Sequence, residues 1–151
     1  MRDTFHERRD TIEVRVYYED TDCGGVVYYA NYLRYFERAR TEYLETRGHS
    51  VAALMEQGTI FVVVHAEVDY RSPSRYGDTL VIQTNVSEVT SASFTFSHVA
   101  REKASGRLVV EGSARLAATD GNGKVKGLDD ALVAALQSDP KKGNEMDRIG
   151  T

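Results

Sequence analysis

The residues of this chain best suited to chemistry lie together in one stretch, Tyr17–Tyr32. It reads YYEDTDCGGVVYYANY: acidic residues first, then a Gly-Gly pair, then the run-in to an expected helix. Asp22 therefore lies close to backbone N–H groups that have no partner inside that helix. Acyl transfer needs a carboxylate that attacks or activates water, and N–H donors for a developing oxyanion. We interpret this stretch as the active site.

Asp22 also has an ordinary explanation, because aspartate is favoured before glycine in turns and at helix starts. In ordinary surroundings an aspartate is ionised at neutral pH, which makes it a poor proton acceptor but an available nucleophile. It could attack an acyl group to form a mixed anhydride, or it could activate a water molecule. Both routes stay open from the sequence.

The neighbours of Asp22 are expected to serve structure. We expect Asp20 to accept backbone N–H groups in the turn and Glu19 to face solvent, since clustered buried carboxylates would repel one another. Tyr18 shares the parity of the inward-facing valines before it, so core packing is expected, with a hydroxyl contact to the site as the alternative. Cys23 has no histidine next to it in the sequence that would activate a thiol.

The elements around this stretch follow from hydrophobic spacing. The apolar run Ile60–Val64 is typical of a strand that is buried on both faces. One long helix followed by strands with short connections predicts an α+β domain over residues 1–137, an antiparallel five-stranded sheet wrapped around one helix. The expected strands are 11–18, 60–70, 79–89, 93–101 and 108–119; the helices are 28–47, ended by Gly48, 51–57 and 129–137; residues 138–151 form a polar tail expected to be disordered.

Bulk properties narrow the functional class. The chain has 151 residues, 41% apolar and 28% charged, as expected for one globular domain. A net charge of −4 gives no support for binding nucleic acid or an anionic membrane. The longest apolar run, Ala131–Leu136, is far shorter than the ~20 residues that span a bilayer. Residues 1–10 contain no apolar run, so we do not expect them to act as a secretory signal. With a single cysteine, we expect a cytoplasmic protein.

Several segments together resemble a known family. The chain is similar to hot-dog-fold thioesterases, and within them to the acyl-CoA thioesterases associated with the Tol-Pal system, also called YbgC-like. The similarity covers about residues 11–118, and the motif Asp-Thr-Asp-x-Gly-Gly-Val-Val-Tyr is its most specific part. The matching segments are Val14–Asp22, Gly24–Tyr28, Asn31–Tyr32, Phe36–Glu42, Tyr70–Pro73 and Gly77–Leu80.

The resemblance implies an assembly and a set of roles. It implies a homodimer or homotetramer with active sites at the dimer interface, where the acyl-pantetheine arm enters between subunits. Asp22 would be the catalytic carboxylate, and the backbone N–H of Tyr29 would polarise the thioester carbonyl. We assign substrate contacts to Gly25, Val26, Tyr28 and Arg71. No metal and no cofactor is expected, because the CoA moiety is part of the substrate.

The chain departs from the family pattern in three places. Tyr29 stands where many YbgC-like members have a histidine, which puts a histidine-assisted mechanism in doubt but leaves the backbone donor unchanged. The related 4-hydroxybenzoyl-CoA thioesterase tolerates tyrosine there, and it clamps CoA phosphates with basic residues at a hairpin that here reads Thr90-Ser91-Ala92. The nucleotide must therefore be held elsewhere or only weakly. Arg71 and Arg75 flank a loop and could meet phosphates, with a solvated surface position as the ordinary alternative. Cys23 replaces a small residue.

The predicted function is hydrolysis of an acyl-CoA thioester to a free acid and CoA. The first alternative is a non-hydrolytic module that binds acyl-CoA, acyl carrier protein or an envelope partner. The second is a hot-dog dehydratase, which uses a histidine and a helix acid. The Asp-Thr-Asp-Cys-Gly-Gly motif argues against the dehydratase. In one class of hot-dog enzymes a helix carboxylate replaces the loop aspartate; Glu37 is the candidate here, but we expect it to pair with a basic neighbour such as Arg34, Arg38 or Arg40.

Overall fold

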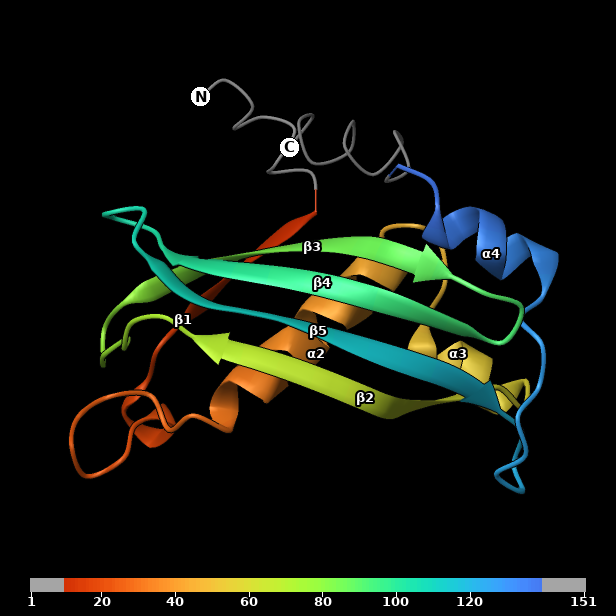
Figure 1. The fold of residues 1–151 in the computed structure, drawn as a ribbon, viewed down its shortest axis with the longest axis horizontal. Helices are drawn as coiled ribbons and strands as arrows, with labels where there is room; N and C mark the ends of the chain where they lie inside the picture. Colours follow the sequence, from red (N-terminus) through yellow and green to blue (C-terminus); the bar gives the residue numbers. More distant parts are fainter. Residues whose placement is uncertain (1–9, 140–151) are drawn as a thin grey trace.

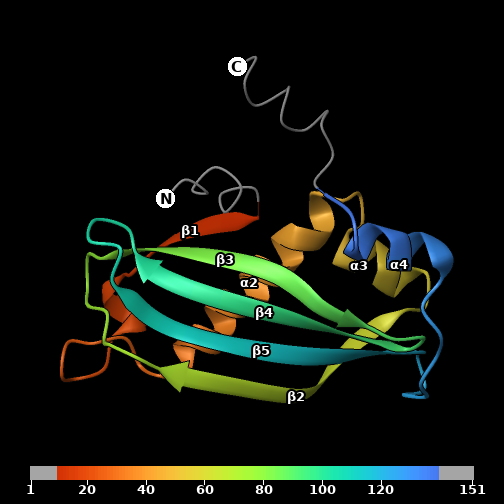
Figure 2. The same cartoon turned by 45° about the horizontal axis from the view of Figure 1, so that its top comes forward.

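The computed structural model describes residues 10–139, in which five antiparallel strands curve around one long helix (Figures 1 and 2). The strand order is β1-β3-β4-β5-β2, and helix α2 crosses behind the sheet. This is the predicted α+β arrangement. The strands are β1 Thr11–Arg15, β2 Ile60–Tyr70, β3 Thr79–Val89, β4 Ser93–Glu102 and β5 Leu108–Thr119; the helices are the 3₁₀ turn η1 Tyr18–Asp20, α2 Asn31–Glu45, α3 Val51–Glu56 and α4 Asp130–Leu136.

The sheet is built from alternating strands joined by tight turns. In β4 the buried residues Phe94, Phe96, His98 and Ala100 alternate with partly exposed ones, because successive side chains point to opposite faces. Short connections join β3 to β4 and β4 to β5 as neighbouring antiparallel pairs. The outer strands β1 and β2 are added at the two edges, and the chain between them carries α2 and α3.

Helix α2 supplies the other half of the core. Its buried side chains recur three or four positions apart, which places them on the face toward the sheet. They divide into one cluster with β1 and β3 and a second with Phe94, Phe96 and α4. In the second cluster, the Tyr43 hydroxyl of α2 donates a hydrogen bond of 2.8 Å to the Leu136 carbonyl of α4. The buried α2 residues are Tyr32, Tyr35, Phe36, Ala39, Tyr43 and Leu44.

The predicted strand at Ile60–Val64 is confirmed as the start of β2, but the predicted burial on both faces is wrong. β2 is an edge strand paired only with β5, and Val62, Val63 and Val64 are 44–51% exposed. A register shift between Val63 and His65 marks a bulge there. The apolar run predicted burial on both faces, but the single chain leaves these valines uncovered.

The start of the chain also differs from the prediction. The first strand ends at Arg15, and Val16 pairs instead with the backbone of Gly77 and Asp78. Tyr18, expected to point into the core, opens the η1 turn and is 80% exposed. Extrapolating strand parity failed because the backbone leaves the sheet before that residue. Similarly, α2 begins at Asn31 and ends at Glu45, inside the predicted range 28–47.

The two ends of the described chain meet at one buried cation. Arg47, 4% exposed, forms an ion pair with Asp10 at 2.9 Å and donates to the Ser138 carbonyl at 2.8 Å. Of the predicted tail, only Ser138 and Asp139 are described, and 140–151 lie outside the described residues. No helix between residues 10 and 139 is long and apolar enough to cross a membrane.

A buried histidine lies between the sheet and α2. The ring of His98 stacks on Phe36 at 4.5 Å, and its Nδ1 shares a hydrogen bond of 3.0 Å with the Thr84 hydroxyl. Its Nε2 has no partner among the described residues. Burial, reinforced by the nearby positive charge of Arg40, lowers the pKa of His98 to about 3.

His98 should make the fold sensitive to acid. Between about pH 6.5 and 3 the unfolded chain binds a proton at this position that the folded chain does not. The free energy of unfolding therefore falls as the pH falls through this window, by up to about 1.4 kcal/mol per pH unit. We expect urea denaturation of His98→Gln to show a shallower pH slope than wild type. Equal slopes for the two proteins would contradict this.

Candidate active site

Residues 17–30, here called the site loop, form a small irregular hairpin ahead of α2. Thr21 and Val27 face each other as an antiparallel bridge. On either side of this bridge, the Asp22 N–H donates to the Val26 carbonyl and the Tyr28 N–H donates to the Asp20 carbonyl, each at 2.9 Å. Asp22 thus lies at the turn end of the hairpin, and Tyr28 lies at the end that runs into the helix.

Asp20 ties this hairpin to the helix. One carboxylate oxygen accepts the Tyr17 N–H at 2.9 Å, and the other accepts the side-chain amide of Asn31 at 3.1 Å. The same Asn31 amide also reaches the Asp20 carbonyl at 3.3 Å. The expected structural role of Asp20 is confirmed, and Glu19 is exposed as predicted. The pKa of the buried Tyr35 hydroxyl is raised, first by burial and second by the negative charge of Asp20. This hydroxyl has no hydrogen-bond partner among the described residues.

Asp22 is exposed in the single chain and has one carboxylate oxygen engaged. Its Oδ1 accepts the Gly24 N–H at 2.8 Å, which is the ordinary turn contact of an aspartate before glycine. Its backbone carbonyl accepts the Gly25 N–H at 3.0 Å, and Gly25 has a φ of +83°, a conformation that favours glycine. The Oδ2 atom has no hydrogen-bond partner within residues 10–139. A negatively charged oxygen is thus available at the surface of the turn.

Tyr29 lies two residues before Asn31, the first residue of α2. Its N–H donates to no acceptor in the described part of the chain, whereas its carbonyl accepts the Tyr32 N–H at 3.3 Å. Its ring is 60% exposed and packs against Tyr28 and Tyr70, with ring centres 4.8 and 6.1 Å away. The position therefore offers an unpaired donor at a helix N-terminus, beside exposed aromatic surface.

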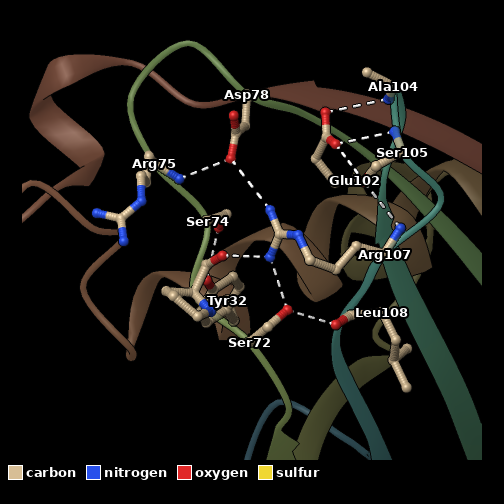
Figure 3. A network of polar contacts seen from close by, with 11 residues as sticks. Tyr32, Ser72, Ser74, Arg75, Asp78, Glu102, Ala104, Ser105, Arg107 and Leu108 are labelled. Carbon is tan, nitrogen blue, oxygen red and sulfur yellow. Dashed lines mark hydrogen bonds and ion pairs between the residues drawn. The ribbon is translucent and has the colours of Figure 1, made fainter.

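Residues 71–78, here called the support loop, hold the site loop from the other side. The Val27 N–H donates to the Ser74 carbonyl at 2.8 Å, and Val26 forms a bridge with Arg75. The fully buried Ser74 hydroxyl shares a hydrogen bond of 2.7 Å with the Tyr32 hydroxyl (Figure 3). The sequence alone predicted no role for Ser74, because no local signal shows which segment a distant loop will contact.

The other predicted site residues, Tyr18 and Arg71, make contacts outside the hairpin that carries Asp22 and Tyr29. Tyr18 packs edge-on against Tyr76, 6.3 Å between ring centres, at the exposed outer surface of the loop. The Arg71 guanidinium is occupied by Glu111 at 3.0 Å and Asp69 at 3.8 Å, so its proposed phosphate contact stays a prediction.

No group of three metal-ligating side chains occurs in the part of the chain that the structure describes. A hollow of about 680 Å³ lies between β1 and α2, but no site-loop residue lines it. In the single chain both Asp22 and Tyr29 are exposed to solvent.

Removing the Asp20 carboxylate should loosen the site loop. Asp20→Ala leaves the Tyr17 N–H and the Asn31 amide without their acceptor, and we expect a loss of about 1–2 kcal/mol in the free energy of unfolding, measured in urea. Glu19→Ala removes the same charge from the neighbouring exposed position and should change the free energy little. An equal loss in both variants would mean that charge, and not the two hydrogen bonds, is what matters.

Comparison with known proteins places this geometry in a family. Residues 16–136 match the sequence profile of the thioesterase-like superfamily. The Acyl-CoA thioesterase YbgC of Haemophilus influenzae is 51% identical over 84 residues, which are 55% of this chain and 62% of that protein, so the match spans less than two thirds of the relative.

Among solved structures, an Aquifex aeolicus protein superposes with a TM-score of 0.80 at 28% identity, covering 84% of this chain and 98% of that one. The DHNA-CoA thioesterase of Staphylococcus aureus gives 0.81 at 25% identity, covering 94% and 95%. The fold is thus that of the hot-dog thioesterases, and this chain belongs to the thioesterase-like superfamily.

Proposed function

We propose that the protein hydrolyses acyl-CoA thioesters to a free carboxylic acid and CoA. The observation that carries the proposal is the pairing, in one hairpin, of an unpartnered carboxylate oxygen on Asp22 with an unpartnered N–H on Tyr29. The relatives named as acyl-CoA thioesterases support the choice of substrate class.

The hydrogen bonds of the hairpin keep both reactive groups on one short piece of backbone. The Asp22 N–H donates to the Val26 carbonyl, and the Tyr28 N–H, next to Tyr29, donates to the Asp20 carbonyl. Hydrolysis of a bound thioester would need an oxygen of Asp22 or of its water about 3 Å from the carbonyl carbon, and the Tyr29 N–H about 3 Å from the carbonyl oxygen.

The proposed reaction uses only these groups and water. Asp22 either attacks the thioester carbon directly or removes a proton from a water that attacks it. Negative charge develops on the carbonyl oxygen, where the Tyr29 N–H and the positive end of the α2 dipole stabilise it. Collapse of the intermediate expels CoA as a thiolate, which takes up a proton; in the first route water then hydrolyses the mixed anhydride. No step requires a histidine at position 29 or a bound cofactor.

For the nucleotide, Arg75 is better supported than Arg71. The Arg71 charge is compensated by two acidic side chains, whereas the Arg75 guanidinium has no acidic partner within residues 10–139. Arg75 also adjoins Val26 of the site loop. A guanidinium is well suited to phosphate, because its planar donors can form two parallel bonds.

We also propose that two chains pair along β2, in a cytoplasmic enzyme. The exposed Val62–Val64 run lies on an edge strand with free backbone groups, and such an edge is a template for pairing with another chain. Pairing would cover apolar surface and would place a second copy near the otherwise open site. A homodimer is the minimum assembly, and a homotetramer would need a further interface.

A non-hydrolytic binding module is the second candidate. It is favoured by one observation, the Asp22–Gly24 hydrogen bond, which shows this aspartate in an ordinary turn role. In that case the hairpin would hold an acyl-CoA without cleaving it.

Turnover of a panel of acyl-CoA thioesters separates the two candidates. We expect Asp22→Asn to lower kcat by about 10²–10⁴-fold on the preferred substrate, because the amide neither attacks nor accepts a proton. Glu19→Gln removes an acid three positions away and should keep near wild-type activity. Equally slow turnover by wild type and Asp22→Asn would refute the proposed thioesterase activity.

The same preparation distinguishes the two chemical routes. In a single turnover in heavy-oxygen water, label in the Asp22 carboxylate indicates an anhydride, and label only in the product acid indicates direct attack by water.

The assembly can be tested by placing a charge on the β2 edge. Val64 is the half-exposed residue at the bulge, so Val64→Lys should shift the protein from a dimer or larger to a monomer in light scattering. Val125→Lys introduces the same charge at a more exposed position outside the strands and should leave the mass unchanged. If Val64→Lys also keeps the wild-type mass, β2 is not the interface.

A further inference from the structure

Arg107 is the last residue of the turn between β4 and β5, and its guanidinium contacts the support loop (Figure 3). Its Nη1 donates to the Ser72 hydroxyl at 2.7 Å and to the Pro73 carbonyl at 2.6 Å. Its Nη2 lies 3.8 Å from the Asp78 carboxylate, which also accepts the Arg75 N–H at 2.9 Å. The Ser72 hydroxyl in turn donates to the Leu108 carbonyl at 2.6 Å. One planar cation therefore contacts the support loop near its beginning, at Ser72 and Pro73, and at its end, at Asp78.

The opposite side of the support loop faces the active site. Ser74, one residue after the Pro73 carbonyl that Arg107 binds, accepts the Val27 N–H on its carbonyl and bonds the Tyr32 hydroxyl through its side chain. Val27 lies two residues before the proposed donor Tyr29, and Tyr32 lies in the first turn of α2. The contacts thus run without interruption from the guanidinium to both ends of the segment that carries the donor.

The other attachments of the support loop are at its ends. The N–H groups of Arg71 and Ser72 donate to the Val109 carbonyl, and the Gly77 N–H donates to the Val16 carbonyl. Between these points the outward-facing polar contact at Pro73 comes from Arg107. Without it, Ser74 keeps its hydrogen bonds to Val27 of the site loop and to Tyr32 of α2, both on the side of the active site.

We propose that Arg107 is a positioning residue for catalysis: through Pro73 and Ser74 it sets where the Tyr29 N–H lies relative to Asp22. The proposal rests on the proposed thioesterase function. The guanidinium acts by geometry, since its fixed fork of donors holds two acceptors at once, which a lysine ammonium on a flexible stem does not reproduce. Displacing a reacting group by about 1 Å can cost about 10²-fold in rate.

This role is separable from general stability. The Arg107 side chain is 40% exposed and belongs to neither hydrophobic cluster. We therefore expect its loss to leave the sheet and the packing of α2 intact and to affect the placement of the loops. Arg101 provides a matched control, because it is an exposed arginine of the same hairpin that donates to the Gly106 carbonyl and makes no contact with the support loop.

The kinetic test compares Arg107→Ala, Arg107→Lys and Arg101→Ala on the best acyl-CoA substrate. We expect Arg107→Ala to lower kcat by about 10-fold or more with KM within about twofold, and Arg107→Lys to recover little of it. Arg101→Ala should match wild type. Ser74→Ala should also lower kcat, and its combination with Arg107→Ala should be no worse than the more damaging single change, because both act on one path. A raised KM with unchanged kcat would overturn the proposal, since Arg107 would then contact substrate directly.

Hydrogen exchange tests the same inference without substrate. Amides in residues 21–32 should exchange faster in Arg107→Ala than in Arg101→Ala, while amides of β4 and β5 should not differ. Unchanged exchange in residues 21–32 would overturn the positioning role even if activity fell. If wild type turned over no acyl-CoA, the proposed function would fail, and the exchange experiment would still decide whether Arg107 positions the loop. Should Arg107→Ala not fold, Arg107→Lys in the same two measurements decides in its place.

Discussion

The Asp20 carboxylate joins the site loop to the first residue of α2, and the placement of the reactive groups depends on that link. The chain leaves the sheet after Val16 and must return to the helix start with a defined register. Asp20 achieves this by binding the Tyr17 N–H behind it and the Asn31 amide ahead of it. With these bonds made, Asp22 lies at the turn and Tyr29 at the helix entrance. A carboxylate also suits this place electrostatically, because the helix N-terminus carries partial positive charge.

The reactive groups lie on irregular backbone, yet each is fixed by a more regular element. The hairpin is bounded on one side by α2 and on the other by the support loop, which is fastened to the β4–β5 hairpin by Arg107. Rigid neighbours of this kind allow a loop to carry catalytic groups with a defined geometry. In a single chain the site residues Asp22, Tyr28 and Tyr29 are exposed, and so are the valines of the β2 edge. The proposed pairing of two chains along β2 would bury the valines and would also bring a second chain close to the site.

Much of this arrangement could be predicted from local patterns. Alternation located the strands after residue 78 to within a residue, and Gly48, with a φ of +88°, ends the helix region as expected. The predictions failed where the outcome depends on distant contacts. Tyr18 follows strand parity in the sequence but lies beyond the point where β1 leaves the sheet. The Ile60–Val64 run reflects surface that one chain leaves uncovered. Ser74 and Arg107, 33 positions apart, carry no local signal of their contact with the site loop.

The proposed placement of a thioester between Asp22 and the Tyr29 N–H can be measured in a crystal structure with a non-hydrolysable thioether analogue of an acyl-CoA, in which one carbon separates the carbonyl from sulfur. We expect the carbonyl oxygen about 3 Å from the Tyr29 nitrogen. We expect an Asp22 carboxylate oxygen to face the carbonyl from the other side, directly or through one water. A carbonyl bound away from the start of α2, with Asp22 still directed only at Gly24 and solvent, would contradict it.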